Sequence, residues 1–438
     1  MQGYHADWCP KTDILPVKLN GHVSKSSSGD ESQTKRRMTT KAARAEHNSA
    51  TMKLLIYSHF FAPSVGGVET LVLSLARGLA AVRTSSGDPD FEITLVTQTP
   101  AGNFDDGSLP FRVVRRPNLA QLWDSIRASD VVHVAGPALT PILFGLMGRK
   151  PVVVEHHGFQ TICPNGQLLI EPAGTPCPGH FMAGLHRECL RCNSGQGWFT
   201  SWKLWLLTFA RRFLCRRVAG NITPTAWLGG LVQLPRVVAI PHGLEFMAAA
   251  LPRSVASLQL PVIAFQGRLV TTKGVGVLFE AARILLAQKR TFELLIIGDG
   301  PEHGSLERLS QESPLAGCVH FAGRLVGAQL DAALARASVV VVPSLGGEVF
   351  GLVVAENMLR GLPVVTSDLG AFVEVLGEGG VTFRTGDAAG LARELTRLLD
   401  DPALAAQLGK SAQRRVLEFC DFRRMLEAHA QVYRQARS

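Results

Sequence analysis

The stretch PSLGGEVFGLVVAENMLRGLP, residues 343–363, decides the fold class of this chain. Four valines at 339–342 precede it and predict a buried strand, which runs through a glycine-containing loop into a helix that opens near Phe350. A strand, a loop and a helix in this order form the unit from which parallel α/β sheets are built. The free N–H groups at the start of the helix can hold a phosphate.

Two carboxylates flank this predicted helix start. Glu348 stands at its entrance, and Glu356 follows eight residues later, which corresponds to about 12 Å along a helix. Carboxylates at that separation can accept hydrogen bonds from hydroxyl groups at opposite ends of a nucleotide sugar. The structural alternative is that Glu348 only stabilises the first turn through the helix dipole.

Apolar strand-like runs and amphipathic segments alternate on both sides of this stretch. The predicted strands cover residues 53–57, 91–96, 130–134, 151–155 and 236–240, then 261–265, 292–297, 318–321, 338–342 and 362–365. Predicted helices include 68–82, 274–288, 302–310, 387–400 and 420–436. This pattern predicts an α/β fold with two doubly wound, Rossmann-like domains facing across a cleft, where ligands lie at the strand ends.

The two series of strands set the expected domain boundaries. We expect an N-terminal domain at 52–247, a linker at 248–260, a C-terminal domain at 261–418 and a C-terminal helix at 419–438. Residues 1–51 are rich in Ser, Thr, Lys and Arg without a hydrophobic period, which predicts a disordered tail. Because a buried strand opens abruptly at Met52, this tail is either a real flexible extension or an artefact of the assigned start.

The charge balance indicates acidic partners. The formal net charge is +9 and the pI is about 9.3, which suits phosphates, nucleic acid or an anionic membrane surface. No basic stripe interleaved with aromatic residues and no nucleic-acid-binding module is visible, so we expect no nucleic acid. The N-terminus lacks the apolar core of a signal peptide, and the uncharged run 131–148 is broken by Pro and Gly. These features predict a cytoplasmic protein.

Basic residues and glycines follow two predicted strands in the second half. Gly267 and Arg268 come directly after a strand, and Lys273 precedes the next helix. Arg and Lys five residues apart on one loop can both reach a diphosphate, although alone they would be ordinary surface cations. Gly298 closes another strand, where a glycine either lets the backbone approach a ligand or permits a tight turn.

The N-terminal half repeats this arrangement. Gly66 and Gly67 follow the first predicted strand and precede the helix 68–82. His157, next to Gly158, lies just beyond the strand 151–155 and is a candidate for a ligand contact, although most histidines in such places are structural.

Two features in the middle of the chain are unusual. Cys163, Cys177, Cys189 and Cys192 lie in a Gly- and Pro-rich insertion, 163–192, that has little core of its own. A structural zinc would organise it, with an iron–sulfur site or plain reduced thiols as alternatives. Residues 198–217 then combine Trp, Phe and Arg, which suits an anionic membrane surface and a lipid-linked acceptor, or else an ordinary packed helix.

From Met52 to about Tyr433, the chain resembles the retaining glycosyltransferases of family 4, which have the GT-B fold. The resemblance lies in two glutamates eight residues apart around a Phe-Gly-Leu helix start, here Glu348 and Glu356. It implies a donor that is a UDP-, GDP- or ADP-sugar, a glycan or lipid-linked acceptor, and a final helix that crosses back to the first domain. It also implies that the enzyme works in polysaccharide or glycolipid assembly at the cell envelope.

The resemblance also implies roles for individual residues. Arg268 and Lys273 would neutralise the donor diphosphate, and Glu356 would hold the ribose. Glu348, with the amides of Phe350, Gly351 and Leu352, would hold the donor sugar. Gly67 would approach the diphosphate from the other domain, and His157 would face the sugar near the reacting carbon.

The mechanism expected from this arrangement rests on charge. Breaking the anomeric bond creates negative charge on the nucleoside diphosphate, which the cations and helix amides stabilise. No Asp-x-Asp motif stands where a metal could do so, and we expect catalysis to need no cofactor. Another GT-B enzyme, such as a sugar-nucleotide epimerase or a phosphorylase, and an inactive binding protein remain as alternatives.

Overall fold

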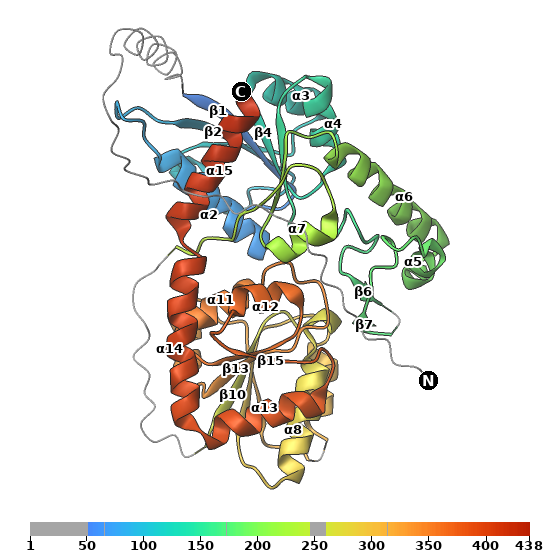
Figure 1. Cartoon of the computed structure of the whole chain (residues 1–438), viewed down its shortest axis with the longest axis vertical. Coiled ribbons are helices and arrows are strands. Elements are labelled where there is room, and N and C mark those ends of the chain that lie inside the picture. Colours follow the sequence, from blue (N-terminus) through green and yellow to red (C-terminus); the bar gives the residue numbers. More distant parts are fainter. Residues whose placement is uncertain (1–50, 65, 172, 246–259, 313) are drawn as a thin grey trace, which may run out of the picture.

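The computed structural model describes residues 51–245 and 260–438, except residues 65, 172 and 313. Most of the predicted tail 1–51 and of the predicted linker 248–260 lies outside the described residues. The chain forms two α/β domains, one above the other along the long axis of the molecule, and each contains one parallel sheet covered by helices (Figure 1).

The first sheet has seven parallel strands in the order β3-β2-β1-β4-β5-β8-β9. Its strands are β1 (Met52–Ser58), β2 (Phe91–Thr97), β3 (Arg112–Arg115), β4 (Val131–Ala135), β5 (Val152–Glu155), β8 (Gly220–Thr223) and β9 (Val237–Ala239). Its helices are α2 (Gly67–Ala81), α3 (Leu119–Ala128), α4 (Leu139–Met147), α6 (Trp198–Cys215) and α7 (Ala226–Val232). Both faces of the sheet are buried, as a parallel sheet requires.

The second sheet has six parallel strands in the order β12-β11-β10-β13-β14-β15. Its strands are β10 (Val262–Gln266), β11 (Glu293–Ile297), β12 (Val319–Gly323), β13 (Val339–Val342), β14 (Val364–Ser367) and β15 (Val381–Phe383). Its helices are α8 (Val275–Ala287), α9 (His303–Ser310), α10 (Gly327–Ala335), α11 (Leu352–Leu359), α12 (Gly370–Leu376), α13 (Ala388–Asp400) and α14 (Pro402–Phe419).

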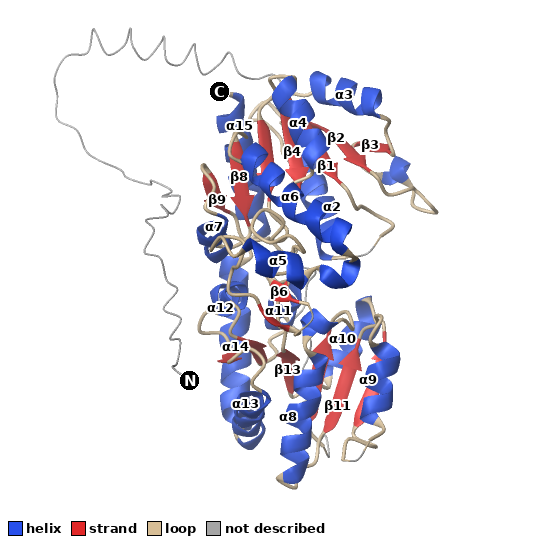
Figure 2. Cartoon of the chain, turned by 90° about the vertical axis from the view of Figure 1, so that its right-hand side faces the viewer, coloured by secondary structure: helices blue, strands red, loops and turns tan. Residues whose placement is uncertain are grey.

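The cysteine-rich insertion and the last helix depart from this regular pattern. Between β5 and β8 the chain forms the hairpin β6 (Leu169–Ile170) and β7 (Thr175–Pro176), then α5 (His186–Cys192). Helix α15 (Phe422–Arg437) follows α14 but packs on the first domain, where Met425 and Tyr433 join the core beneath β1 (Figures 1 and 2). The chain therefore crosses between the two domains twice.

Most expected strands agree with the structure to within two residues, whereas several short ones were not predicted. Strand β8 is an example: Gly220–Thr223 reads as polar, yet all four residues are buried. Its Asn221 is satisfied inside the protein because the side-chain amide donates to the carbonyls of Cys215 and Pro235 at 3.0 and 2.9 Å. A polar residue with internal hydrogen bonds can be buried at little cost, which hides the strand from a hydrophobicity pattern.

A carboxylate joins the two domains directly. Glu374 on α12 accepts hydrogen bonds from the backbone amides of Ala226 and Trp227, which open α7, at 2.8 Å each. Two N–H groups at a helix start have no partner within the helix, so this side chain caps a helix of the other domain.

We predict that Glu374→Ala lowers stability by about 1–3 kcal/mol, because two partly buried amides lose their acceptor. The midpoint of thermal unfolding, followed by circular dichroism, should fall. Glu378→Ala is the matched control, since Glu378 is exposed and forms no ion pair with any described residue. Equal midpoints for the two variants would show that the contact does not stabilise the fold.

Candidate active site

Three strand-to-helix loops of the second domain are packed against one another. The amide of Gly267 donates to the carbonyl of Ile297 at 3.0 Å, which ties the loop after β10 to the loop after β11. A Cβ added at Gly298 would lie 1.8 Å from the carbonyl oxygen of Gly267, and one added at Gly274 would lie 2.0 Å from that of Pro343. These glycines are required by close backbone packing, which fixes the relative positions of the loops.

Lys273 and Glu348 meet where these loops converge. The Lys273 Nζ lies 2.5 Å from the Glu348 Oε1, and the Ser344 hydroxyl donates to the same oxygen at 2.9 Å. Both side chains are partly exposed. The site therefore contains a cation and a carboxylate that compensate each other and can each turn to a ligand.

Arg268 differs from Lys273 in having no acidic partner. Its side chain is exposed and forms no ion pair with any residue of the described ranges. An exposed guanidinium on the same loop as Lys273 is suited to bind an anion with a forked pair of hydrogen bonds.

Glu356 lies deeper, on the second turn of α11. Its Oε2 accepts from the Gln266 Nε2 at 3.4 Å, and Gln266 in turn accepts from Asn357 at 2.9 Å. Burial raises the pKa of Glu356, while Arg360 and the hydrogen bond from Gln266 act in the opposite direction. This carboxyl group is therefore held in place but keeps unused acceptor capacity.

Helix α11 begins at Leu352, two residues after the expected opening near Phe350. Gly351 precedes it with φ of 94°, and no side chain caps the helix start. A Cβ on Gly351 would lie 2.5 Å from the Phe372 ring, while Phe350 is buried. The first amides of the helix are thus left for a ligand or water.

The first domain reaches this helix start through its own glycine loop. A Cβ added at Gly67, the first residue of α2, would lie 3.1 Å from the Leu352 Cδ1. One added at Gly66 would lie 2.5 Å from the Glu69 carboxylate. Both loops that the sequence analysis selected, one from each domain, are in contact.

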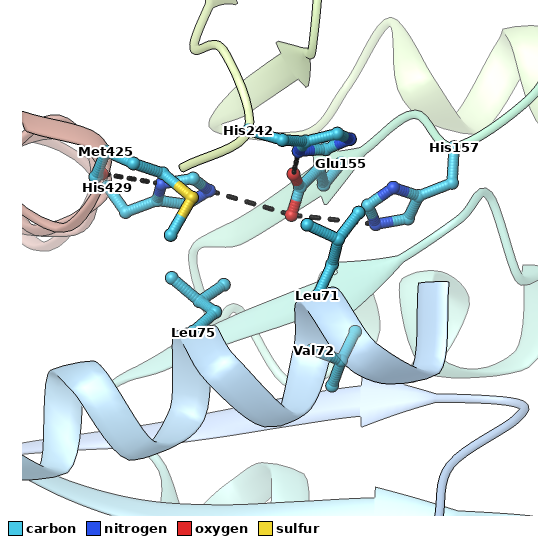
Figure 3. Close-up of a pocket in the computed structure, with 8 residues that line it drawn as sticks. All are labelled: Leu71, Val72, Leu75, Glu155, His157, His242, Met425 and His429. Atoms are coloured by element: carbon cyan, nitrogen blue, oxygen red, sulfur yellow. Dashed lines mark hydrogen bonds and ion pairs between the residues drawn. The ribbon is translucent and has the colours of Figure 1, made fainter. Parts of the chain in front are cut away.

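A buried carboxylate gathers histidines at the end of β5. His157 does not extend freely: its Nε2 lies 3.6 Å from the Glu155 Oε2 (Figure 3). His133 and His429 approach the same oxygen at 3.3 and 3.6 Å, and His242 approaches the Oε1 at 3.7 Å. Sequence reasoning selected only His157 from this group.

The charges of this group follow from burial. Burial by itself would raise the pKa of Glu155, but the attraction of His157 and of the nearby His133 and His429 rings outweighs it and holds that pKa well below its usual range. Burial lowers the pKa of His242 to about 3 and also lowers that of His157. Glu155 is therefore held in its ionised form, while burial disfavours the charged forms of His157 and His242.

The four cysteines share one small subdomain without the geometry of a metal site. The Cys163 thiol donates to the Asn165 Oδ1 at 2.9 Å, and the Asn165 Nδ2 lies 3.5 Å from the Cys192 sulfur. Burial raises the pKa of Cys189 to about 12, and the four thiols remain unpaired. Among described residues, only Glu155, His157 and His242 bring three ligand atoms within 4.8 Å of one another. The zinc expected at the cysteines, Cys177 included, is not supported.

Helix α6 carries a continuous exposed aromatic face. Trp198 and Phe199 are 72% and 74% exposed, and the face continues along the helix through Trp202, Leu206, Phe209 and Phe213. Their spacing places them within one 100° sector of a helix. No helix in the described part of the chain is both long and apolar enough to cross a membrane.

The chain is similar to known glycosyltransferases in sequence and in structure. The MMP alpha-(1→4)-mannosyltransferase of Mycolicibacterium hassiacum is 34% identical over 418 residues, which cover 88% of this chain and 98% of that protein. The phosphatidyl-myo-inositol mannosyltransferase of Mycolicibacterium smegmatis is 40% identical over 33% of this chain and 37% of its own length. The chain spans between 35% and 56% of the length of five such curated relatives.

The fold is that of GT-B glycosyltransferases. The HepE protein of Anabaena, solved in complex with UDP-glucose, superposes with a TM-score of 0.63 at 17% identity, over 87% of this chain and 98% of that one. A model of the family described as glycosyl transferases group 1 matches residues 260–401, a range that contains Arg268, Lys273, Glu348 and Glu356. With a relative of 34% identity over almost its whole length, this chain belongs to the glycosyl transferases group 1 family.

Proposed function

We propose that this protein transfers a sugar, of hexose type, from a nucleotide-sugar donor to a glycan or lipid-linked acceptor with retention of anomeric configuration. The observation that carries the proposal is the Lys273–Glu348 pair, which lies near the start of α11 and on whose β10–α8 loop the exposed Arg268 also stands. Two cations and free amides suit a diphosphate, and a carboxylate beside them suits sugar hydroxyls.

In this proposal, different residues bind different parts of the nucleotide-sugar donor. Arg268 and Lys273 neutralise the diphosphate and the charge that develops on it as the anomeric bond breaks. When Lys273 turns to the diphosphate, Glu348 is released to accept from the donor sugar, while Glu356 accepts from the ribose. Gly66 and Gly67 bring the first domain against the same helix, where they close the site from the acceptor side.

The acceptor side is formed by the first domain and its cysteine-rich insertion. The amide of Gly347, one residue before Glu348, donates to the carbonyl of Gln167 in that insertion at 2.6 Å. The insertion therefore borders the donor-sugar loop, where it can contact an acceptor. A product with the same anomeric configuration as the donor, identified by NMR, is the expected result for a retaining enzyme.

Binding of donors separates this proposal from its alternatives. A panel of UDP-, GDP- and ADP-sugars should identify one nucleotide that binds selectively and is slowly hydrolysed without acceptor. An epimerase would instead convert the free nucleotide sugar, and an inactive binding protein would release no nucleoside diphosphate.

Arg268→Ala is expected to weaken donor binding by roughly 10- to 100-fold, since a hydrogen-bonded charge contributes about 1.5–3 kcal/mol. Isothermal titration with the selected nucleotide sugar measures this. The control variant is Lys410→Ala, which removes an exposed cation on α14 that forms no ion pair with any described residue. It should bind the nucleotide sugar as tightly as the parent protein does. Unchanged donor binding by Arg268→Ala would contradict the proposal that Arg268 binds the donor diphosphate.

Donor binding should weaken as the pH falls below the raised pKa of Glu356, because the protonated carboxyl group loses an acceptor for ribose hydroxyls. The Glu356→Gln variant should bind more weakly at neutral pH and should lose this pH dependence. Circular dichroism at each pH excludes acid unfolding. Identical pH profiles for the parent and the variant would exclude Glu356 as the titrating group.

We further propose that the exposed face of α6 contacts an anionic membrane, so that the enzyme works peripherally at the inner, cytoplasmic surface. Two aromatic residues, Trp198 and Phe199, are largely exposed at its start, and Arg216 and Arg217 lie exposed at its end. Aromatic side chains enter the interface while the cations remain at anionic headgroups.

The double variant Trp198→Ser, Phe199→Ser should lose most of its sedimentation with vesicles that contain phosphatidylglycerol, while its donor binding stays that of the parent. Leu417→Ser is the control, because Leu417 is an exposed apolar residue on α14. Binding of the parent to neutral phosphatidylcholine vesicles should be weak. Equal vesicle binding by the double variant and the parent would exclude the exposed face of α6 as the membrane contact.

A further inference from the structure

The histidine cluster around Glu155 is assembled from segments far apart in the sequence. His133 lies in β4, Glu155 and His157 at the end of β5, His242 beyond β9, and His429 in the returning helix α15. All are buried or nearly so. Ring nitrogens of His157, His242 and His429 point toward the Glu155 carboxylate (Figure 3), and the His133 Nε2 also lies 3.3 Å from it. None of the residues to which the proposed function gives a role in donor binding belongs to this cluster.

Several buried ring nitrogens of this cluster lack a hydrogen-bond partner among the described residues. The His429 Nδ1 lies 2.9 Å from the carbonyl oxygen of Met425, so this nitrogen carries a proton and donates it. Among the described residues, the Nε2 atoms of His133, His157 and His429 are buried without a hydrogen-bond partner. A water or a bound ion shared by the nitrogens and the carboxylate would satisfy such atoms.

The distances suit a metal ion better than a hydrogen bond. Separations of 3.6 Å for His157 and 3.7 Å for His242 exceed the roughly 2.7–3.2 Å of an N–H···O bond. Zinc lies about 2.0–2.2 Å from nitrogen and carboxylate oxygen, which puts two ligand atoms of a tetrahedral site about 3.3–3.5 Å apart. One ligand atom from each of Glu155, His157 and His242 falls within 4.8 Å of the others.

A small cavity adjoins these three residues. Its volume is about 10 Å³, and Leu71, Val72 and Leu75 of α2 form its apolar wall (Figure 3). That is room for about one water-sized occupant. Two histidines and one glutamate with a single open position form a ligand set typical of zinc, whereas Mg²⁺ and Ca²⁺ prefer oxygen ligands alone.

We propose that Glu155, His157 and His242 bind one zinc-like divalent transition-metal ion. His133 and His429 support it from outside: His133 faces the Glu155 Oε2 and is itself bonded through Nδ1 to the Tyr433 hydroxyl at 3.0 Å. The His242 ring contacts the Phe350 ring, 4.8 Å between centroids, and the amide of Gly243 lies 3.0 Å from the Met425 sulfur. The ion therefore fastens the place where both domains and α15 meet.

The first test measures metal in the parent protein. Protein purified without a histidine tag should contain about one zinc per chain by mass spectrometry. Protein stripped with a chelator should take up one Co²⁺, with visible ligand-field bands but without a thiolate-to-cobalt charge-transfer band. Zinc should also raise the thermal midpoint of the stripped protein. Stripped, folded protein that takes up neither Zn²⁺ nor Co²⁺ overturns the proposal.

Variants locate the ion. His242→Asn and Glu155→Gln should each lose the bound metal, while the double variant Cys189→Ser, Cys192→Ser should retain it. Metal that disappears with the cysteines and persists in His242→Asn overturns the assignment. Because metal content and cobalt spectra are read without any sugar transfer, failure of this site is distinguishable from failure of the proposed donor site. Even if a variant does not fold, the cobalt spectrum of the parent protein shows whether a metal binds and whether thiolates are among its ligands.

Discussion

The buried charge of Glu155 is the constraint on which the junction of the two domains depends. A carboxylate without water is costly unless other groups stabilise it, and here the stabilising groups come from β4, from the loops after β5 and β9, and from α15. The returning helix is therefore tied to the first domain by polar contacts as well as by the apolar packing of Met425 and Tyr433. Any movement of α15 relative to the first domain must therefore leave the Glu155 carboxylate in contact with groups that stabilise its charge.

A second constraint acts on the donor side. The loops after β10, β11 and β13 approach so closely that Gly274 and Gly298 tolerate no side chain. This packing holds Lys273 against Glu348, close to the start of α11, in the structure without a ligand. A site that is already ordered needs little further ordering on binding. Contacts such as Glu374 with α7 and Gly67 with Leu352 then set the first domain against this preformed half-site.

Sequence reasoning succeeded where local pattern and function coincide. The valines at 339–342 form β13, and the two glutamates lie on either side of the start of α11, because apolar periodicity and glycine placement act over short distances. It failed for β8, whose buried Asn221 is satisfied by distant carbonyls. The zinc that the closely spaced cysteines suggested is not supported, and among the described residues the three ligand atoms that lie within 4.8 Å of one another belong to Glu155, His157 and His242.

By itself, the sequence determined the α/β class, the two sheets and the residues of the donor-side loops, since each depends on neighbours within a few residues. The tertiary structure alone decided which distant groups meet. His133 and Tyr433 are 300 residues apart and share a hydrogen bond, and Glu155 acquires its histidines only when β4, the loop after β9 and α15 come together at the end of β5. Such a cluster leaves no periodic signal, because its members are selected by proximity in the folded chain and by the energetic cost of burying a charge.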